Sequence, residues 1–100
     1  MYKIGNLRKG EKGIRVDRSS GSPLGNPFYL ADANNDKQRK AVIDSFRAWF
    51  IKHKEDLKVK EELDRIRLLH EKGDVTLICW CSPKPCHAEV IRDFLMGKEI

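Results

Sequence analysis

The segment Asp74-Val-Thr-Leu-Ile-Cys-Trp-Cys81 is a nearly unbroken apolar run with the length of one strand. Such a run is typical of a strand that is covered on both faces, as in the middle of a parallel sheet. A helical pattern that closes at Lys72-Gly73 precedes it, and a short helical pattern over residues 90–95 follows it. We therefore predict that residues 74–81 form a central strand, parallel to at least one neighbour.

The rest of the chain supplies the elements that surround this strand. Apolar residues alternate in two short N-terminal segments, and Phe46 and Phe50 belong to a series of apolar residues at three- and four-residue steps. These patterns predict strands at 2–7 and 13–17, a turn at 9–13, helices at 36–54 and 57–72, and a final helix that begins at Pro85. The order predicts one small α/β domain, residues 1–100, in which helices flank a sheet with a central parallel strand.

Composition and charge narrow the class of protein further. The chain has 100 residues, 40% of them hydrophobic, and a net charge of +5. No segment approaches the roughly 18 consecutive apolar residues of a membrane-spanning helix, and the first ten residues lack the apolar core of a signal peptide. We therefore expect a cytoplasmic protein with no membrane contact. Its excess positive charge favours anionic partners.

The residues that follow the central strand form the first candidate site. Ligands of open α/β sheets usually bind at the carboxyl ends of the strands, where Cys81 is expected. If the last helix starts at Pro85, Cys86 and His87 lie in its first turn, where the helix dipole favours anions and a thiolate. Cys86 and His87 are therefore our candidate catalytic pair, as nucleophile and acid/base, and Cys81 is a candidate ligand contact.

Two other interpretations of the cysteines stay open. Cys79 could be a small core residue, since buried cysteines commonly pack as hydrophobes. Cys81, Cys86 and His87 could also bind zinc, but the spacing C-x-C-x4-C-H lacks the usual C-x2-C pair, and adjacent ligands at a helix start must diverge. Three cysteines within eight residues are also a poor disulfide framework, which favours reduced thiols. We assign no metal and no cofactor.

A second candidate site lies in the N-terminal third of the chain. Arg8 and Arg18 follow the predicted strands, and arginines at strand ends can bind phosphate with two parallel hydrogen bonds. Gly25 lets the backbone approach a ligand, and Asn26 offers a donor and an acceptor beside the rigid Pro27. The alternative is that the arginines are solvated or paired with aspartates and that Gly-Asn-Pro is an ordinary turn.

The motifs together resemble a known family. They are Asn6-Leu7-Arg8, Val16-Asp17-Arg18, Leu24-Gly25-Asn26-Pro27-Phe28, a Trp-bearing helix, and Cys79-Trp80-Cys81-x-Pro83-x-Pro85-Cys86-His87. In this order they resemble the domain-of-unknown-function family numbered 4326, a small domain met in phages and bacteria. The resemblance implies a compact, Rossmann-like α/β domain and names no reaction.

The function that we expect is binding of a nucleotide-like or other phosphorylated small molecule at the carboxyl edge of the sheet. Whether the domain also processes this ligand is open. One alternative is a phage interaction factor that acts on a host protein through the charged helical segment. Another is nucleic-acid binding through the basic helix 36–54, which ranks lower because the aromatic residues of that helix stand at core spacing.

Overall fold

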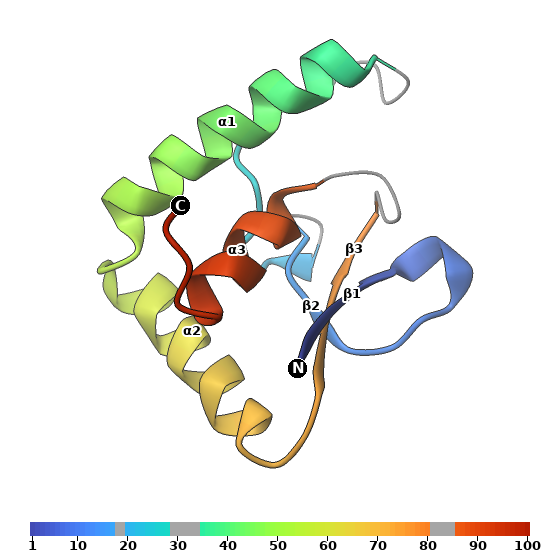
Figure 1. Ribbon diagram of the computed structural model, residues 1–100, viewed down its shortest axis with the longest axis vertical. Coiled ribbons are helices and arrows are strands. Elements are labelled where there is room, and N and C mark those ends of the chain that lie inside the picture. The colour runs from blue at the N-terminus through green and yellow to red at the C-terminus, as the bar shows by residue number, and fades with distance from the viewer. Residues whose placement is uncertain (18–19, 29–34, 81–85) are drawn as a thin grey trace.

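The structure, a computed structural model, describes residues 1–17, 20–28, 35–80 and 86–100. Arg18 and Cys81, two of the candidate ligand contacts, and Pro85, the expected start of the last helix, lie outside the described residues. The elements, shown in Figure 1, are β1 (Tyr2–Asn6), the 3-10 turn η1 (Leu7–Lys9), β2 (Ile14–Arg15), α1 (Asp36–His53), α2 (Leu57–His70), β3 (Val75–Cys79) and α3 (His87–Leu95).

The described strands form one parallel sheet in the order β1-β3-β2. β1 runs beside β3 over its whole length, and the shorter β2 pairs with the middle of β3. The prediction of a central parallel strand is confirmed. β2 has two residues where the sequence predicted five, because the chain turns away after Val16, whose N–H still donates to the carbonyl of Ile78 at 3.0 Å.

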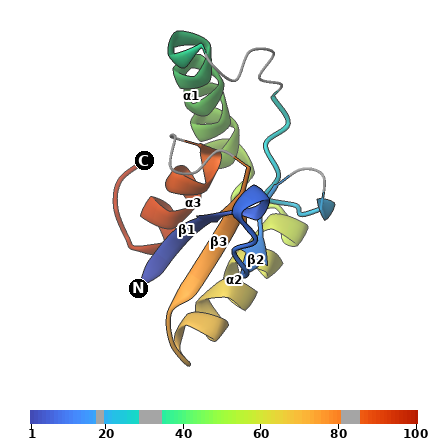
Figure 2. The ribbon, with the colours of Figure 1, turned by 90° about the vertical axis from the view of Figure 1, so that its right-hand side faces the viewer.

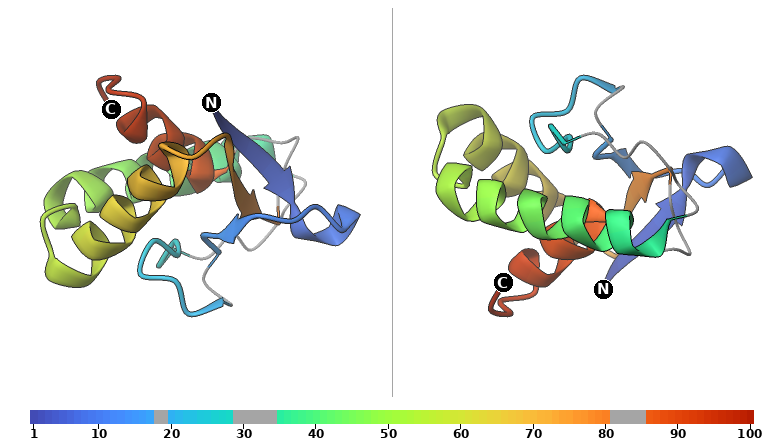
Figure 3. Two further views of the ribbon diagram at one scale, coloured as in Figure 1. Left: turned by 90° about the horizontal axis from the view of Figure 1, so that it is seen from below. Right: turned by 90° about the horizontal axis from the view of Figure 1, so that it is seen from above.

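One face of the sheet carries the main core and is covered by helices. Val75, Leu77 and Cys79 alternate along β3 and belong to one cluster with the buried apolar side chains of all three helices. The helical members with under 3% of their surface exposed are Phe46, Phe50, Leu63, Ile66, Ala88, Val90 and Ile91. Figure 3 shows the helices together on one side of the strands. The predicted helices thus lie in a single layer over the sheet.

The opposite face is covered by the chain between β1 and β2. Ile78 points to this side and is only 1% exposed. A Cβ atom built on Gly5 would lie 2.9 Å from the Glu11 carboxylate and from the Ile78 side chain, and one built on Gly13 would lie 2.3 Å from the Thr76 carbonyl oxygen. Glu11 and Gly13 of this connection therefore come close to the strands, and Figure 2 shows the connection in front of the sheet.

The helix boundaries follow identifiable caps. α1 begins after Asn35, whose side chain accepts the Gln38 N–H at 3.0 Å. α1 and α2 are separate helices. α3 begins at His87, two residues later than predicted, so Cys86 is its N-cap and lies outside the first turn. Among the described helices, none has the length and apolar character needed to cross a membrane.

Candidate functional site

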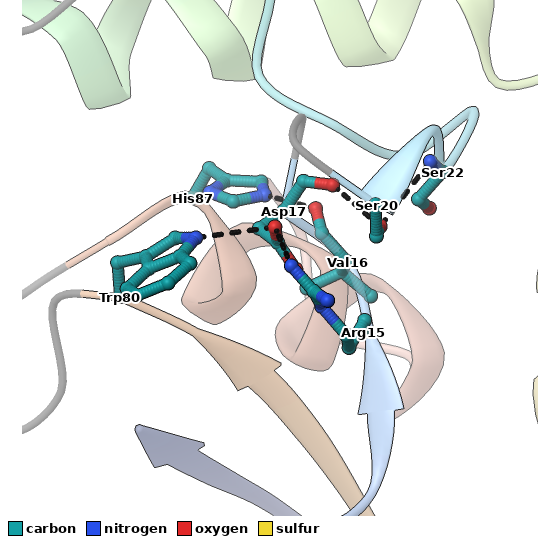
Figure 4. Close-up of polar contacts among 7 residues, drawn as sticks. All are labelled: Arg15, Val16, Asp17, Ser20, Ser22, Trp80 and His87. Carbon is teal, nitrogen blue, oxygen red and sulfur yellow. Dashed lines mark hydrogen bonds and ion pairs between the residues drawn. The ribbon is translucent and has the colours of Figure 1, made fainter. Parts of the chain in front are cut away.

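Four segments of the chain meet at the carboxyl edge of the sheet. Arg8 follows β1, Asp17 follows β2, Trp80 follows β3, and His87 opens α3. Because the three strands are parallel, their carboxyl ends lie at the same edge. Figure 4 shows the indole of Trp80, the carboxylate of Asp17 and the ring of His87 close together there.

Asp17 is the polar centre of this edge. Its side chain is almost completely buried, and both carboxylate oxygens have donors. Arg15 donates from Nε to Oδ1 at 2.9 Å and from Nη2 to Oδ2 at 2.7 Å, and Trp80 donates from Nε1 to Oδ2 at 3.1 Å. A buried carboxylate needs such compensation, because desolvation of an unpaired charge is costly. The pairing therefore fixes the indole of Trp80 to the end of β2.

Trp80 presents an aromatic surface at the edge. Its side chain is half-buried, with 40% of the residue exposed, although its N–H is held by Asp17. The guanidinium carbon of Arg8 lies over the indole ring, 5.5 Å from the ring centroid, in a cation–π contact. The ring is thus held in one orientation while much of it stays open to solvent, which suits the stacking of a planar ligand.

His87 connects the start of α3 to the end of β2. Its Nε2 donates to the carbonyl oxygen of Val16 at 2.7 Å, since a carbonyl can only accept, and its ring packs edge-on against Phe46 with centroids 5.0 Å apart. Burial lowers the pKa of His87, and the Val16 carbonyl and the charge of Asp17 oppose this effect only in part. The imidazole is therefore neutral at neutral pH.

Cys86 faces the interior at the start of α3. Its backbone N–H donates to Glu89 Oε2 at 3.0 Å, and its Sγ lies 2.9 Å from Sγ of Cys79. Cys79 is a buried member of the core cluster, where the first interpretation placed it. The described contacts of the proposed catalytic pair therefore diverge, with Cys86 turned to Cys79 and His87 turned to Val16.

The loop that holds Gly25 and Asn26 is joined to the edge through serines. Ser20 Oγ donates to the carbonyl of Asp17 at 2.7 Å, and the N–H of Ser22 donates to Ser20 Oγ at 3.3 Å. The carbonyl of Ser22 then accepts the N–H of Gly25 at 3.0 Å. Asn26 Oδ1 accepts the N–H of Phe28 at 2.9 Å, so its described contact is a local turn.

The structure thus brings part of the predicted site together. Arg8 and His87 lie at the edge, Cys86 lies directly behind it, and Gly25 is linked to it by the serines. Sequence reasoning missed the central roles of Asp17 and Trp80. Each of these residues directly follows a strand, and this position could have marked it as a candidate. The residues next to Asp17 and Trp80 in the sequence do not indicate that the two side chains form a hydrogen bond.

Metal ligands do not gather in the described part of the chain. No group of three or more His, Cys, Asp or Glu side chains with the spacing of a metal site occurs among these residues. The largest sulfur cluster described is the pair Cys79 and Cys86.

These features define a small parallel α/β domain with polar and aromatic side chains gathered at the carboxyl edge of its sheet. The chain belongs to the family described as domain of unknown function DUF4326, which matches residues 2–97. No curated protein and no solved structure matches the chain.

Proposed function

We propose that the carboxyl edge of the sheet binds a nucleotide-like or other phosphorylated small molecule. The observation that carries the proposal is the indole of Trp80, half-exposed, held at its edge by Asp17 and covered on one side by Arg8. A tryptophan that only filled the core would be buried and would not need a buried carboxylate to orient it. An oriented, accessible indole is what a flat heteroaromatic ring such as a nucleobase requires for stacking.

The charge of the edge suits the phosphate part of such a ligand. Arg8 is exposed and already lies against the indole, so its guanidinium can contact an anion beside a stacked base. The N-terminus of α3 adds the positive end of a helix dipole at the same edge. Arg18 stays a further candidate from the sequence.

The proposal concerns binding, and Cys86 and His87 have supporting roles in it. Both are buried, and their described partners, Cys79 and Val16, are interior groups. In this arrangement His87 ties α3 to β2, and Cys86 caps α3. Their contribution to a ligand site is thus to hold Trp80 and Asp17 in position.

The described contacts of the basic helix give less support to nucleic acid as the ligand. Lys40 and Arg47 both pair with Asp44, at 3.4 and 2.8 Å, so part of the positive charge of α1 is neutralised on its own surface. A protein partner of the charged helical segment stays a prediction.

Calorimetric titration with three probes tests the proposal. AMP carries a base and a phosphate, adenosine carries only the base, and ribose 5-phosphate carries only the phosphate. We expect AMP to bind more tightly than either fragment, because only AMP can use both Trp80 and Arg8. A single-stranded oligonucleotide of the same base provides the nucleic-acid comparison.

Arg8→Ala and Lys9→Ala form the matched pair of variants for this titration. Both residues lie in η1 and are exposed, but Arg8 is the one that covers Trp80. Loss of a charged contact to phosphate should weaken AMP binding about tenfold in Arg8→Ala, equivalent to about 1.4 kcal/mol. Lys9→Ala should bind as the wild type does. Equal effects of the two substitutions, or no binding of any phosphorylated probe, would count against the proposal.

A further inference from the structure

Two thiols that belong to different elements touch in the interior behind the edge. Cys79 is the last residue of β3, and Cys86 is the N-cap of α3. Their sulfur atoms are 2.9 Å apart, and the two residues are 1% and 4% exposed. A disulfide bond has an S–S length of about 2.05 Å. The sulfurs therefore need to move together by less than an ångström to become bonded.

We infer that Cys79 and Cys86 are a site of reversible oxidation, at which a peroxide converts the two thiols into an intramolecular disulfide. This inference goes beyond ligand binding and does not depend on it. The two residues are seven positions apart, so the bond would close a small ring, residues 79–86, across the junction of β3 and α3.

The sulfur separation favours a disulfide over a shared metal ion. Two thiolates on one tetrahedral zinc ion, each at about 2.3 Å from the metal, stand about 3.8 Å apart. The observed 2.9 Å is well below that separation. The Nε2 atom of His87, the neighbouring residue, is directed to the carbonyl of Val16 and away from the two sulfurs. The pair is therefore arranged for bond formation between the sulfurs.

A groove between α1 and α3 gives a small oxidant a route to the pair. It has a volume of about 740 Å³, and Cys86 lines it together with Ile43 and Val90. Cys79 does not line this groove and is the more deeply buried of the two cysteines. Cys86 is also at the N-terminus of α3, where the helix dipole stabilises negative charge. The first attack therefore starts from Cys86.

The chemistry balances with one molecule of hydrogen peroxide. The thiolate of Cys86 attacks one peroxide oxygen and the O–O bond breaks, so that Cys86 becomes a sulfenic acid and hydroxide leaves. The hydroxide takes up the proton that the Cys86 thiol released when it ionised, which gives the first water. The sulfur of Cys79 then attacks the Cys86 sulfur, the S–O bond breaks, and a second water leaves with the thiol proton. Two electrons pass from the thiols to the peroxide. A dithiol such as dithiothreitol reverses the bond by exchange.

The consequence for the molecule is a covalent tie directly beneath the edge. Trp80 follows Cys79, and His87 follows Cys86, so the bond fixes the two positions from which these side chains reach Asp17 and Val16. Oxidation would therefore hold the edge in one arrangement.

Peptide mapping of the full chain after oxidation tests the inference. Reduced protein is treated with hydrogen peroxide, denatured in the presence of N-ethylmaleimide, and digested with chymotrypsin, which cleaves after Trp80. We expect the protein to lose two hydrogen masses and the peptide that ends at Trp80 to stay joined to the peptide that carries Cys86. Because Cys81 lies on the same chymotryptic peptide as Cys86, fragmentation of the joined peptides is needed to locate the alkyl group, which should be on Cys81. Dithiothreitol should restore three alkylated cysteines.

The variant Cys81→Ser leaves only the two inferred partners and should form the same bond. Cys79→Ala in the Cys81→Ser background is the control, and it should form none within the monomer. A bond between Cys81 and Cys86, cross-links only between molecules, or full alkylation of Cys79 after peroxide treatment would overturn the inference. The mapping of the wild-type protein decides between these outcomes even if a variant fails to fold.

Discussion

The two faces of the sheet are covered in different ways. On one face, Leu77 lies beneath three helices whose apolar side chains recur at helical spacing. On the other face, Ile78 lies beneath a short connection that approaches the strands at Gly5 and Gly13. One cover is apolar packing of helical side chains, and the other is a short connection that comes close to the strands at two glycines. Both exclude water from β3, which explains its unbroken apolar sequence.

The carboxyl edge is where these two covers meet. Arg8 comes from the connection between β1 and β2, and His87 comes from the helical layer. Between them stand Trp80 and Asp17, joined by a hydrogen bond of 3.1 Å. The candidate site thus depends on the packing of both faces, so a substitution that disturbs either face should also alter the site.

A substitution that removes a buried side chain from the helical face should cause the largest loss of stability. Leu77→Ala removes a fully buried side chain from the middle of β3 and should lower the free energy of unfolding by about 3–4 kcal/mol. Thr76→Ala, the neighbour that points to the other face and is only partly buried, should cost about 1 kcal/mol or less. Urea unfolding measures both. Similar losses would mean that the two faces are packed alike.

The connection on the other face should depend on one glycine. In Gly13→Ala the new Cβ would meet the backbone carbonyl of Thr76, so we expect a loss of about 2–3 kcal/mol, the upper range for overpacking. Gly10→Ala is the control in the same connection. It has open space around it and only the strain of a φ of 74°, which should cost about 1 kcal/mol. Equal losses would contradict the close approach at Gly13.

The buried Asp17 carboxylate, which pairs with the partly exposed Arg15 at the edge, should contribute more to stability than a carboxylate on the helical surface. Asp17→Asn leaves the donors of Arg15 and Trp80 without a carboxylate and should lower stability by about 1–2 kcal/mol. Asp44→Asn, at a half-exposed position that pairs with Lys40 and Arg47, should cost about 0.5 kcal/mol. Denaturation at neutral pH gives both values, and tryptophan fluorescence should shift only in Asp17→Asn.

His87, which joins the helical layer to the carboxyl edge, should make a smaller contribution to the free energy of unfolding, and this contribution should depend on pH. Because burial lowers the pKa of folded His87 below 6.5, the unfolded chain binds a proton that the folded chain does not. Neutral His87 therefore contributes its full share of stability above pH 6.5, and this share is lost as the pH falls below 6.5. The free energy of unfolding should fall by at most about 1.4 kcal/mol per pH unit for this one group.

His87→Gln, compared with the wild type between pH 7 and 5, should therefore show a shallower fall in unfolding free energy. The other two histidines are present in both proteins and cancel in the difference. A steeper fall in the variant would show that folded His87 is the more readily protonated form.

The elements that form the helical face were easier to predict from the sequence than the contacts on the other face or at the edge, because strands and helices leave local periodic patterns. The apolar run of β3 and the spacing of Phe46 and Phe50 are local signals of strand and helix, and both predictions are confirmed. The close approach of Gly13 to Thr76 depends on tertiary structure and leaves no periodic pattern. The start of α3 was placed too early because cysteine is not among the usual N-cap residues.

The candidate site was predictable in location but not in composition. The carboxyl end of β3 follows from the strand order, and Arg8 and His87 do lie there. Asp17 and Trp80 are 63 positions apart, so no local sequence pattern predicts the hydrogen bond between them. Asn26, expected to meet the ligand, has a turn contact instead, which local sequence explains equally well.

A nuclear magnetic resonance titration with AMP tests the central claim most directly. The protein has two indole N–H groups, Trp80 at the edge and Trp49 on α1 in the helical layer. We predict that the Trp80 signal and the backbone signals of Arg8 and Asp17 shift in a saturable way, while the Trp49 signal stays in place. Shifts confined to Trp49 and the outer residues of α1, or no saturable shift at Trp80, would contradict a ligand site at the carboxyl edge.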